Sequence, residues 1–134
     1  MELVPIREEH YEFVRVLRNT SKGFLTEANI TPEEQIEYMN KYHKNYYICL
    51  LYEKPVGWIG VIDNDIRLCT HPKYLRHGVG TFMLREIVKI FPDAIGRILA
   101  DNTRSQKTFQ SANVPYTVIG GLDENYKTQP IRDS

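Results

Sequence analysis

The segment from Thr70 to Leu84, THPKYLRHGVGTFML, contains the residues whose types and spacing point most directly to chemistry. A strand-like run ends before a proline, and Gly78 and Gly80 then open an amphipathic run. Glycine lets a ligand approach the backbone closely, and the unpaired N–H groups of a first helical turn attract anions. Together with Arg76, this pattern predicts a pyrophosphate site, although Gly-x-Gly alone also fits an ordinary helix start.

Two other phosphate-binding motifs are excluded by their spacing. The third glycine of the dinucleotide fingerprint does not follow Gly80, and the sequence contains no Gly-Lys-Ser/Thr of a nucleoside triphosphate loop.

The elements that would position this segment follow from hydrophobic periodicity and turn residues. Helix starts are indicated at Thr31-Pro32-Glu33-Glu34 and at Asn102, and turns at Glu53-Lys54-Pro55 and Asp63-Asn64. We predict strands over Met1–Arg7, Tyr46–Tyr52, Val56–Ile62, Asp65–Thr70, Ile95–Ala100 and Pro115–Ile119, and helices over Glu8–Asn19, Pro32–Tyr42, Gly78–Phe91 and Thr103–Asn113. This order predicts an α/β (α+β) fold with a mixed, mostly antiparallel sheet of about six or seven strands and about four helices.

Length and composition fit one domain over residues 1–134, with 42% apolar residues, 25% charged residues and a formal net charge of zero. This charge balance argues against a nucleic-acid partner, and no apolar run approaches the roughly 20 residues that cross a bilayer. We expect a cytoplasmic protein in which Cys49 and Cys69 are buried thiols, with a disulfide or a nucleophile as the alternatives. We expect no metal.

Three stretches resemble the GNAT superfamily of N-acetyltransferases. His71-Pro72-x-Tyr74-Leu75-Arg76-His77-Gly78-x-Gly80 resembles the family's acyl-CoA-binding motif, in which a turn leads into a helix that opens with Gly-x-Gly. Ala100-Asp101-Asn102-x-x-Ser105-x-x-x-Phe109 resembles the second motif, and Pro55-Val56-Gly57-Trp58-Ile59-Gly60 resembles the third strand. The resemblance spans about Tyr46 to Ile119, which is over half of the chain.

The resemblance implies a splayed sheet that holds acetyl-CoA in its cleft and an amine that attacks the thioester directly, without an acyl-enzyme. The edge of Leu68, Cys69 and Thr70 would bind the pantetheine arm. The main chain around Leu75, Arg76, His77, Gly78, Val79, Gly80 and Thr81 would hold the pyrophosphate, and Asn102, Ser105 and Phe109 would lie near the pantetheine.

The sequence departs from the family pattern at three positions. Leu75 replaces the usual arginine or glutamine, and Arg76 is the candidate to replace its charge. Phe109 replaces the common general-acid tyrosine, and Arg97 or a neighbour occupies the place where many relatives carry a glutamate base. Tyr116 could supply the missing hydroxyl, or it could be a core aromatic residue.

A base is needed because keeping a primary amine neutral at pH 7 costs about 4.6 kcal/mol for a pKa near 10.4. Asp63 and Asp65 are the candidates, and ordinary turn acids are the alternative. We expect His71 to face solvent and His77 to lie beside the phosphates.

On the acceptor side, Arg18 and Asn19 precede a loop and a helix in a way that resembles acetyltransferases of nucleotide-linked aminosugars. His43, Tyr42, Tyr46 and Tyr47 are further candidates to line this side, with core packing as the alternative.

The predicted function is transfer of an acetyl group from acetyl-CoA to a small-molecule primary amine, with an aminosugar as one candidate acceptor. The alternatives are acetylation of a protein N-terminus or lysine, and a catalytically weak acyl-CoA sensor. The tail after Gly120 is short for the family, so a homodimer in which a partner chain completes the last strand is one expectation.

Overall fold

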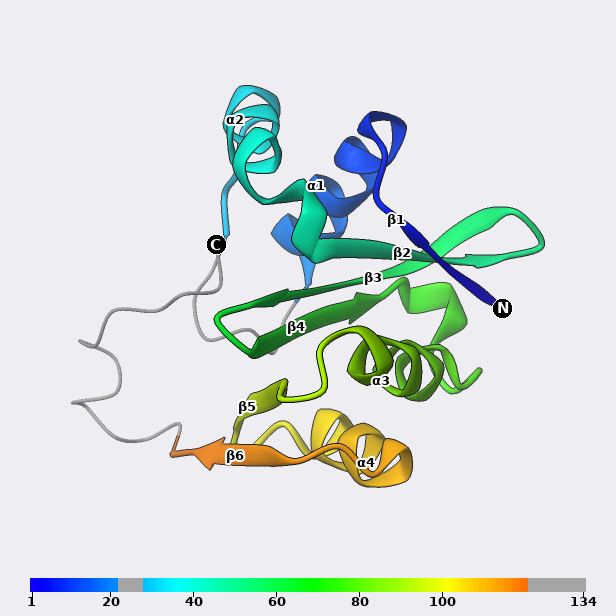
Figure 1. The fold of residues 1–134 in the computed structure, drawn as a ribbon, viewed down its shortest axis with the longest axis vertical. Helices are drawn as coiled ribbons and strands as arrows, with labels where there is room; N and C mark the ends of the chain where they lie inside the picture. Colours follow the sequence, from blue (N-terminus) through cyan, green and yellow to red (C-terminus); the bar gives the residue numbers. More distant parts are fainter. Residues whose placement is uncertain (22–27, 121–134) are drawn as a thin grey trace.

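The computed structural model describes residues 1–21 and 28–120 (Figure 1). The strands are β1 (Glu2–Pro5), β2 (Tyr46–Leu51), β3 (Lys54–Ile62), β4 (Asp65–Thr70), β5 (Ile95–Leu99) and β6 (Tyr116–Ile119). The helices are α1 (Tyr11–Thr20), α2 (Pro32–Tyr42), α3 (Val79–Ile90) and α4 (Thr103–Ala112), with short 3-10 turns at Glu8–His10, His43–Asn45 and Pro72–Tyr74. The order of the elements is the predicted one. The expectation for the tail after Gly120 concerns residues 121–134, which lie outside the described residues.

The six strands form one mixed sheet in the order β1-β2-β3-β4-β5-β6. The pairs β1–β2, β2–β3 and β3–β4 are antiparallel, whereas β4–β5 and β5–β6 are parallel. Strand β4 pairs with β5 only at Asp65↔Ile95 and Ile66↔Gly96. The two strands therefore separate along the second half of β4. This gives the mixed sheet that the order of elements predicts and the splay that the family resemblance implies.

The helices divide into two pairs, α1 with α2 and α3 with α4, at opposite ends of the view in Figure 1. Residues alternate between two hydrophobic clusters along the strands, so that Ile48 belongs to one and Cys49 to the other. The larger cluster includes Met83 and Ile87 of α3 and the ring of Phe109 of α4. The smaller cluster joins α1 and α2 to the opposite face, so each half of the molecule has its own core.

Both hairpins between central strands close through two residues with positive φ. These are Tyr52 and Glu53 between β2 and β3, and Asp63 and Asn64 between β3 and β4. Two successive positive φ angles match the right-handed twist of the flanking strands. The predicted turn at Asp63-Asn64 is therefore confirmed, but the first turn lies earlier than predicted, and Lys54 begins β3.

Two helix starts differ in how well the sequence located them. Helix α2 begins as predicted, because the Thr31 hydroxyl accepts from the Glu34 amide and the Glu34 carboxylate accepts from the Thr31 amide. The predicted helix from Glu8 instead starts as a 3-10 turn, and α1 begins at Tyr11. The Nδ1 atom of His10 accepts from the Arg7 amide and holds this tighter first turn in place. The other boundaries agree with the prediction or differ from it by at most two residues.

Candidate functional site

The turn before α3 presents a group of unpaired backbone donors. Within the described part of the chain, the N–H groups of Arg76, Gly78, Val79, Gly80 and Thr81 have no hydrogen-bond acceptor, and the first bond of the helix joins the Phe82 amide to the Gly78 carbonyl. Val79, Gly80 and Thr81 form the first turn of a twelve-residue helix, where the helix dipole adds positive potential. This arrangement can bind an anion such as a diphosphate.

The backbone of this turn is bent at two left-handed residues, Arg76 with φ of 68° and Gly78 with φ of 77°. Such a conformation favours glycine, and a Cβ atom at Gly78 would have no heavy atom within 4 Å. Leu75 is extended, and the Nδ1 atom of His77 lies 3.0 Å from the Leu75 carbonyl oxygen. Arg76 and His77 are exposed, so both side chains are accessible to a bound anion.

Glycine at position 80 is explained by a different feature, the close approach of a neighbouring helix. A Cβ atom there would lie 2.8 Å from the Cγ2 atom of Thr108 on α4, and 3.9 Å from atoms of Leu68 and Thr70 on β4. The sequence suggested that both glycines make room for a ligand. The structure shows that Gly80 also allows α3 and α4 to approach each other, while Gly78 supplies a backbone conformation.

The gap between β4 and β5 begins next to this turn. Leu68 and Thr70 of β4 point toward α3, as their closeness to Gly80 shows, while Cys69 belongs to the cluster on the α1–α2 side. The outer backbone edge of Leu68, Cys69 and Thr70 has no pairing with β5. Among residues 1–21 and 28–120, the predicted pantetheine edge is therefore an unpaired strand edge that leads to the amides at the start of α3.

The second predicted motif forms the start of α4. The Asn102 side chain accepts a hydrogen bond from the Ser105 amide at 3.2 Å and so caps the helix. The Gln106 side chain donates to the carbonyl oxygens of Leu99 and Ala100, which fixes the end of β5 on the far side of the gap.

Phe109 and Tyr116 lie near the closed end of the gap. Phe109 is 2% exposed. Its ring packs against Gly96, where an added Cβ atom would lie 2.4 Å from the nearest ring atom. Its ring centre is 5.8 Å from that of Tyr116, whose hydroxyl accepts from the Gln110 amide at 2.7 Å. Phe109 thus packs in the core, and the Tyr116 hydroxyl is bound to an exposed side chain of α4. The roles predicted for both residues stay predictions.

The two candidate bases occupy different environments. Asp63 is exposed at the tip of the β3–β4 hairpin. Asp65 is buried at the start of β4, and its Oδ2 atom lies 3.3 Å from Nη2 of Arg67, which is 4% exposed. A guanidinium at this distance stabilises the ionised carboxylate. Asp65 therefore forms an ion pair with Arg67 in this structure, and its role as a base stays a prediction.

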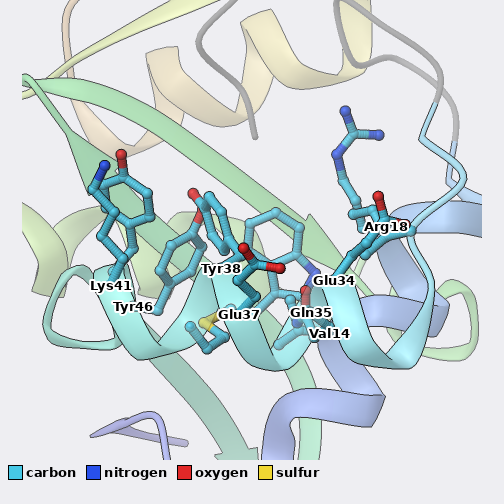
Figure 2. Close-up of a pocket in the computed structure, with 12 residues that line it drawn as sticks. Val14, Arg18, Glu34, Gln35, Glu37, Tyr38, Lys41 and Tyr46 are labelled. Carbon is cyan, nitrogen blue, oxygen red and sulfur yellow. The ribbon is translucent and has the colours of Figure 1, made fainter.

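A pocket of about 440 Å³ lies on the opposite face of the sheet from α3, between α1, α2 and strands β2 and β3 (Figure 2). Its lining residues are Val14, Arg18, Ile30, Glu34, Gln35, Glu37, Tyr38, Met39, Lys41, Tyr42, Tyr46 and Trp58. Trp58 pairs in register with Cys69 of β4. One wall of the pocket is therefore next to the strand whose other edge opens into the gap.

The two predicted acceptor residues differ in their surroundings. Arg18 lines the pocket and is 5% exposed. Its positive charge opposes the rise that burial causes in the pKa of the Cys69 thiol. Asn19 instead binds both backbone groups of Ile30, donating to its carbonyl and accepting from its amide at 2.9 Å. Among the tyrosine and histidine candidates, Tyr42 and Tyr46 line the pocket. The Nδ1 atom of His43 lies 3.0 Å from the Met39 carbonyl oxygen, and Tyr47 packs against the other core.

The sequence reasoning missed three features of this side of the sheet. Arg67 was not singled out, although a charged residue inside the apolar run IRLC is a signal of a buried ion pair. Glu37 and Tyr38 were also missed, although residues 34, 37, 38, 41 and 42 share one face at helical spacing. That stripe is polar and aromatic rather than aliphatic, which is typical of a helix that lines a pocket.

Comparisons with known proteins agree with this geometry. The sequence model of the acetyltransferase (GNAT) family matches residues 10–113. The fold is similar to a GNAT-family acetyltransferase from Streptococcus pneumoniae, with 15% identity, a TM-score of 0.65 and 81% of each chain covered. It is also similar to a protein provisionally described as a phosphinothricin N-acetyltransferase, with 18% identity, a TM-score of 0.66, and 81% of this chain and 79% of that one covered.

A spermidine N-acetyltransferase chimera from Vibrio cholerae is a third structural neighbour, with 10% identity, a TM-score of 0.63, and 84% of this chain and 80% of that one covered. A search of curated proteins finds no match. No helix in the described ranges has the length and apolar character that a membrane span requires. The family match covers most of the chain, from the start of α1 to the end of α4, and the chain belongs to the GNAT family of acetyltransferases.

Proposed function

We propose that this chain transfers an acetyl group from acetyl-CoA to the primary amine of a small molecule. The observation that carries this proposal is a group of five amides, at Arg76 and from Gly78 to Thr81, that have no acceptor among the described residues and lie at the mouth of the gap between β4 and β5. Membership of an acetyltransferase family supports the reaction class.

In this proposal the amides at the start of α3 bind the diphosphate of CoA, and the open edge from Leu68 to Thr70 binds the pantetheine arm. Neutral backbone donors suit this task because they need no counter-ion and are already oriented by the helix. The exposed guanidinium of Arg76 adds a positive charge at the same turn. It supplies the charge that the family's usual residue would provide at Leu75.

The chemistry then needs only direct attack. The amine nitrogen forms a bond to the thioester carbonyl carbon, the carbon–sulfur bond breaks, the nitrogen loses a proton, and the departing thiolate gains one. Cys49 and Cys69 are both buried, and burial raises the pKa of each thiol to about 11, so neither is suited to form an acyl-enzyme. This supports transfer without a covalent intermediate.

The size and position of the pocket between α1 and α2 support a small-molecule acceptor. A volume of about 440 Å³ is within the range of small-ligand sites. Its wall at Trp58 adjoins β4 through the pairing with Cys69, so an acceptor bound there approaches the strand from the face opposite α3. An aminosugar belongs in the acceptor panel on the strength of the Arg18-Asn19 pattern.

Two substitutions at Gly78 test the cofactor site with matched shapes. Asparagine and aspartate both tolerate a left-handed backbone, and the space around this Cβ is open. Like charges about 4 Å apart repel by about 1 kcal/mol in water and more near a protein surface, so Gly78→Asp should weaken CoA binding about tenfold relative to Gly78→Asn. Isothermal titration with CoA measures this ratio, and equal affinities for the two variants would contradict a diphosphate at this turn.

Turnover separates an enzyme from a sensor. Release of free CoA thiol with acetyl-CoA and a panel of amines should be detected for at least one acceptor. Binding of CoA without turnover of any amine or peptide would support the sensor alternative instead. The Tyr116→Phe variant belongs in the same assay, because an unchanged rate would remove Tyr116 as the general acid.

A further inference from the structure

One face of α2 forms the floor of the acceptor pocket and combines aromatic rings with charged groups. Glu34, Glu37, Tyr38, Lys41 and Tyr42 lie on this face because their spacing is three, four, seven and eight residues along the helix. Figure 2 shows Arg18 and Lys41 at opposite ends of the labelled set, with Glu37 and Tyr38 between them.

Four aromatic side chains follow one another through the pocket wall. The ring centres of Tyr42 and Tyr38 are 4.7 Å apart, and the series continues to Tyr46 and then to Trp58 at 5.9 Å per step. A hydrogen bond of 2.7 Å between the hydroxyls of Tyr38 and Tyr46 fixes the middle of this series. The faces of such rings attract cations, and Trp and Tyr do so most strongly.

The charges on the same face show which end of the pocket suits a cation. The Lys41 ammonium already lies 5.2 Å from the centre of the Tyr42 ring, so this wall accepts an ammonium group. Glu34 accepts a hydrogen bond from the Thr31 amide. Glu37 is exposed, and in the described ranges it has neither a hydrogen bond nor an ion pair. Its carboxylate is therefore available to a ligand beside the Tyr38 ring.

From these contacts we infer that the acceptor carries a second cationic group in addition to the amine that is acetylated. The second ammonium binds at the outer part of the pocket, between the Glu37 carboxylate and the Tyr38 ring. The inference rests on the proposed function, since it names the substrate class of that acceptor site.

The inner end of the pocket suits the reacting amine. It adjoins Trp58 and through it Cys69 of β4, and it contains the buried side chain of Arg18. A positive neighbour disfavours protonation of an amine, and the reacting nitrogen must be neutral to attack. A linear diamine or polyamine satisfies both ends, because its far ammonium stays charged at the outer part while the near amine loses its proton.

The test compares two acceptors and two variants. Cadaverine has an amine at each end of a five-carbon chain, whereas pentylamine lacks one of them. Glu37→Gln removes one negative charge from the pocket lining and keeps the side-chain shape. Glu33→Gln makes the same change on the same helix at an exposed position outside the pocket lining, and serves as the control.

We expect the wild type to have a higher kcat/KM for cadaverine than for pentylamine. Glu37→Gln should raise the KM for cadaverine about three- to fivefold, the range of an exposed ion pair, and leave that for pentylamine unchanged. Glu33→Gln should change neither. A wild-type preference for pentylamine, or an equal effect of Glu37→Gln on both amines, would overturn the inference while leaving the proposed function intact.

Titration of each amine into the CoA-saturated protein gives a second measurement that does not need turnover. Cadaverine binding that Glu37→Gln weakens, without acetylation of any amine, would support the site and refute the proposed function. If neither amine binds and other amines are acetylated, the inference is wrong and the enzyme assignment stands.

Discussion

The close approach of α3 and α4 at Gly80 leads to a quantitative prediction for a double-mutant cycle. In Gly80→Ala the new Cβ would lie 2.8 Å from Thr108 Cγ2, about 0.6 Å inside an ordinary contact. Overpacking of this kind costs about 1–3 kcal/mol, and alanine regains up to about 1 kcal/mol over glycine in a helix. We therefore expect a net loss of about 1 kcal/mol in the free energy of unfolding.

Thr108→Ser is the matched partner because it removes only the methyl group in question. The hydroxyl that donates to the Arg104 carbonyl at 3.0 Å is kept. In this background Gly80→Ala should be neutral or stabilising, since the helix-propensity gain of up to about 1 kcal/mol is no longer opposed by overlap.

Urea denaturation of the wild type, both single variants and the double variant gives the coupling free energy. We expect a coupling of about 1–2 kcal/mol, well above the additivity error of about 0.5 kcal/mol. A coupling within that error would refute the contact between Gly80 and Thr108 as the reason for glycine at this position. Parallel titration with CoA would then show whether the glycine serves ligand approach instead.

The other predictions concern titrating and buried groups. Burial raises the pKa of Cys49 and Cys69 from 9.0 to about 11. The free energy of unfolding should therefore fall as pH rises from about 9 to 11, by up to about 2.7 kcal/mol per thiol. Denaturation measured at pH 8 and at pH 10.5 checks this. The same burial predicts that iodoacetamide labels neither thiol in the native protein at pH 8. Burial lowers the pKa of His10, so its contribution to stability is present above pH 6.5 and is lost as pH falls through the lowered pKa; His10→Asn should remove that part of the acid slope. Asp65→Asn should cost about 3–5 kcal/mol in denaturation because it breaks a buried ion pair, whereas Asp63→Asn in the exposed turn should change stability by less than about 0.5 kcal/mol.

Local signals were sufficient for most of the fold. The capping box at Thr31, the apolar period of α3 and the Asp63-Asn64 turn each depend on residues a few positions apart, and the structure confirms all three. The position of the first hairpin turn was missed because Pro55 looked like a turn residue. Proline is tolerated there because β4 ends opposite Gly57, so β3 has only one neighbour at that point.

The turn before α3 was predictable for the same reason, since its glycines and its helix start are adjacent in the sequence, while its binding of a diphosphate stays a prediction. The roles of Phe109 and Gly80 were harder, because they depend on contacts with Gly96 and Thr108 that join separate elements. No local pattern distinguishes a glycine that faces a ligand from one that faces a helix.

The pocket between α1 and α2 could be predicted only in part. Arg18, Tyr42 and Tyr46 were candidates for this side, but which residues of α1, α2, β2 and β3 meet in the pocket depends on how these elements pack. The position of Tyr46 illustrates this. Its ring occupies the space that a side chain at Gly60 would need, and its hydroxyl reaches Tyr38 on α2. Burial raises the pKa of Tyr46 well above its ordinary value, the neighbouring Tyr38 adds to this rise, and Arg67 opposes it. The sequence indicated Tyr46 as a candidate to line the acceptor side, but it did not indicate the contacts of Tyr46 with Tyr38 and Gly60.

The short pairing between β4 and β5 has a consequence for motion. In the part of the chain that the structure describes, the strands join the antiparallel half of the sheet to the parallel half through two residue pairs, Asp65↔Ile95 and Ile66↔Gly96. The packing of α3 and α4 against each other and against the sheet adds to this connection. In the second half of β4, beyond these two pairs, the backbone N–H and C=O groups of every second residue point into the gap rather than toward a neighbouring strand. These amides should exchange hydrogen for deuterium faster than those shared between β3 and β4, and a bound thioester carrier that bridges the gap should slow them.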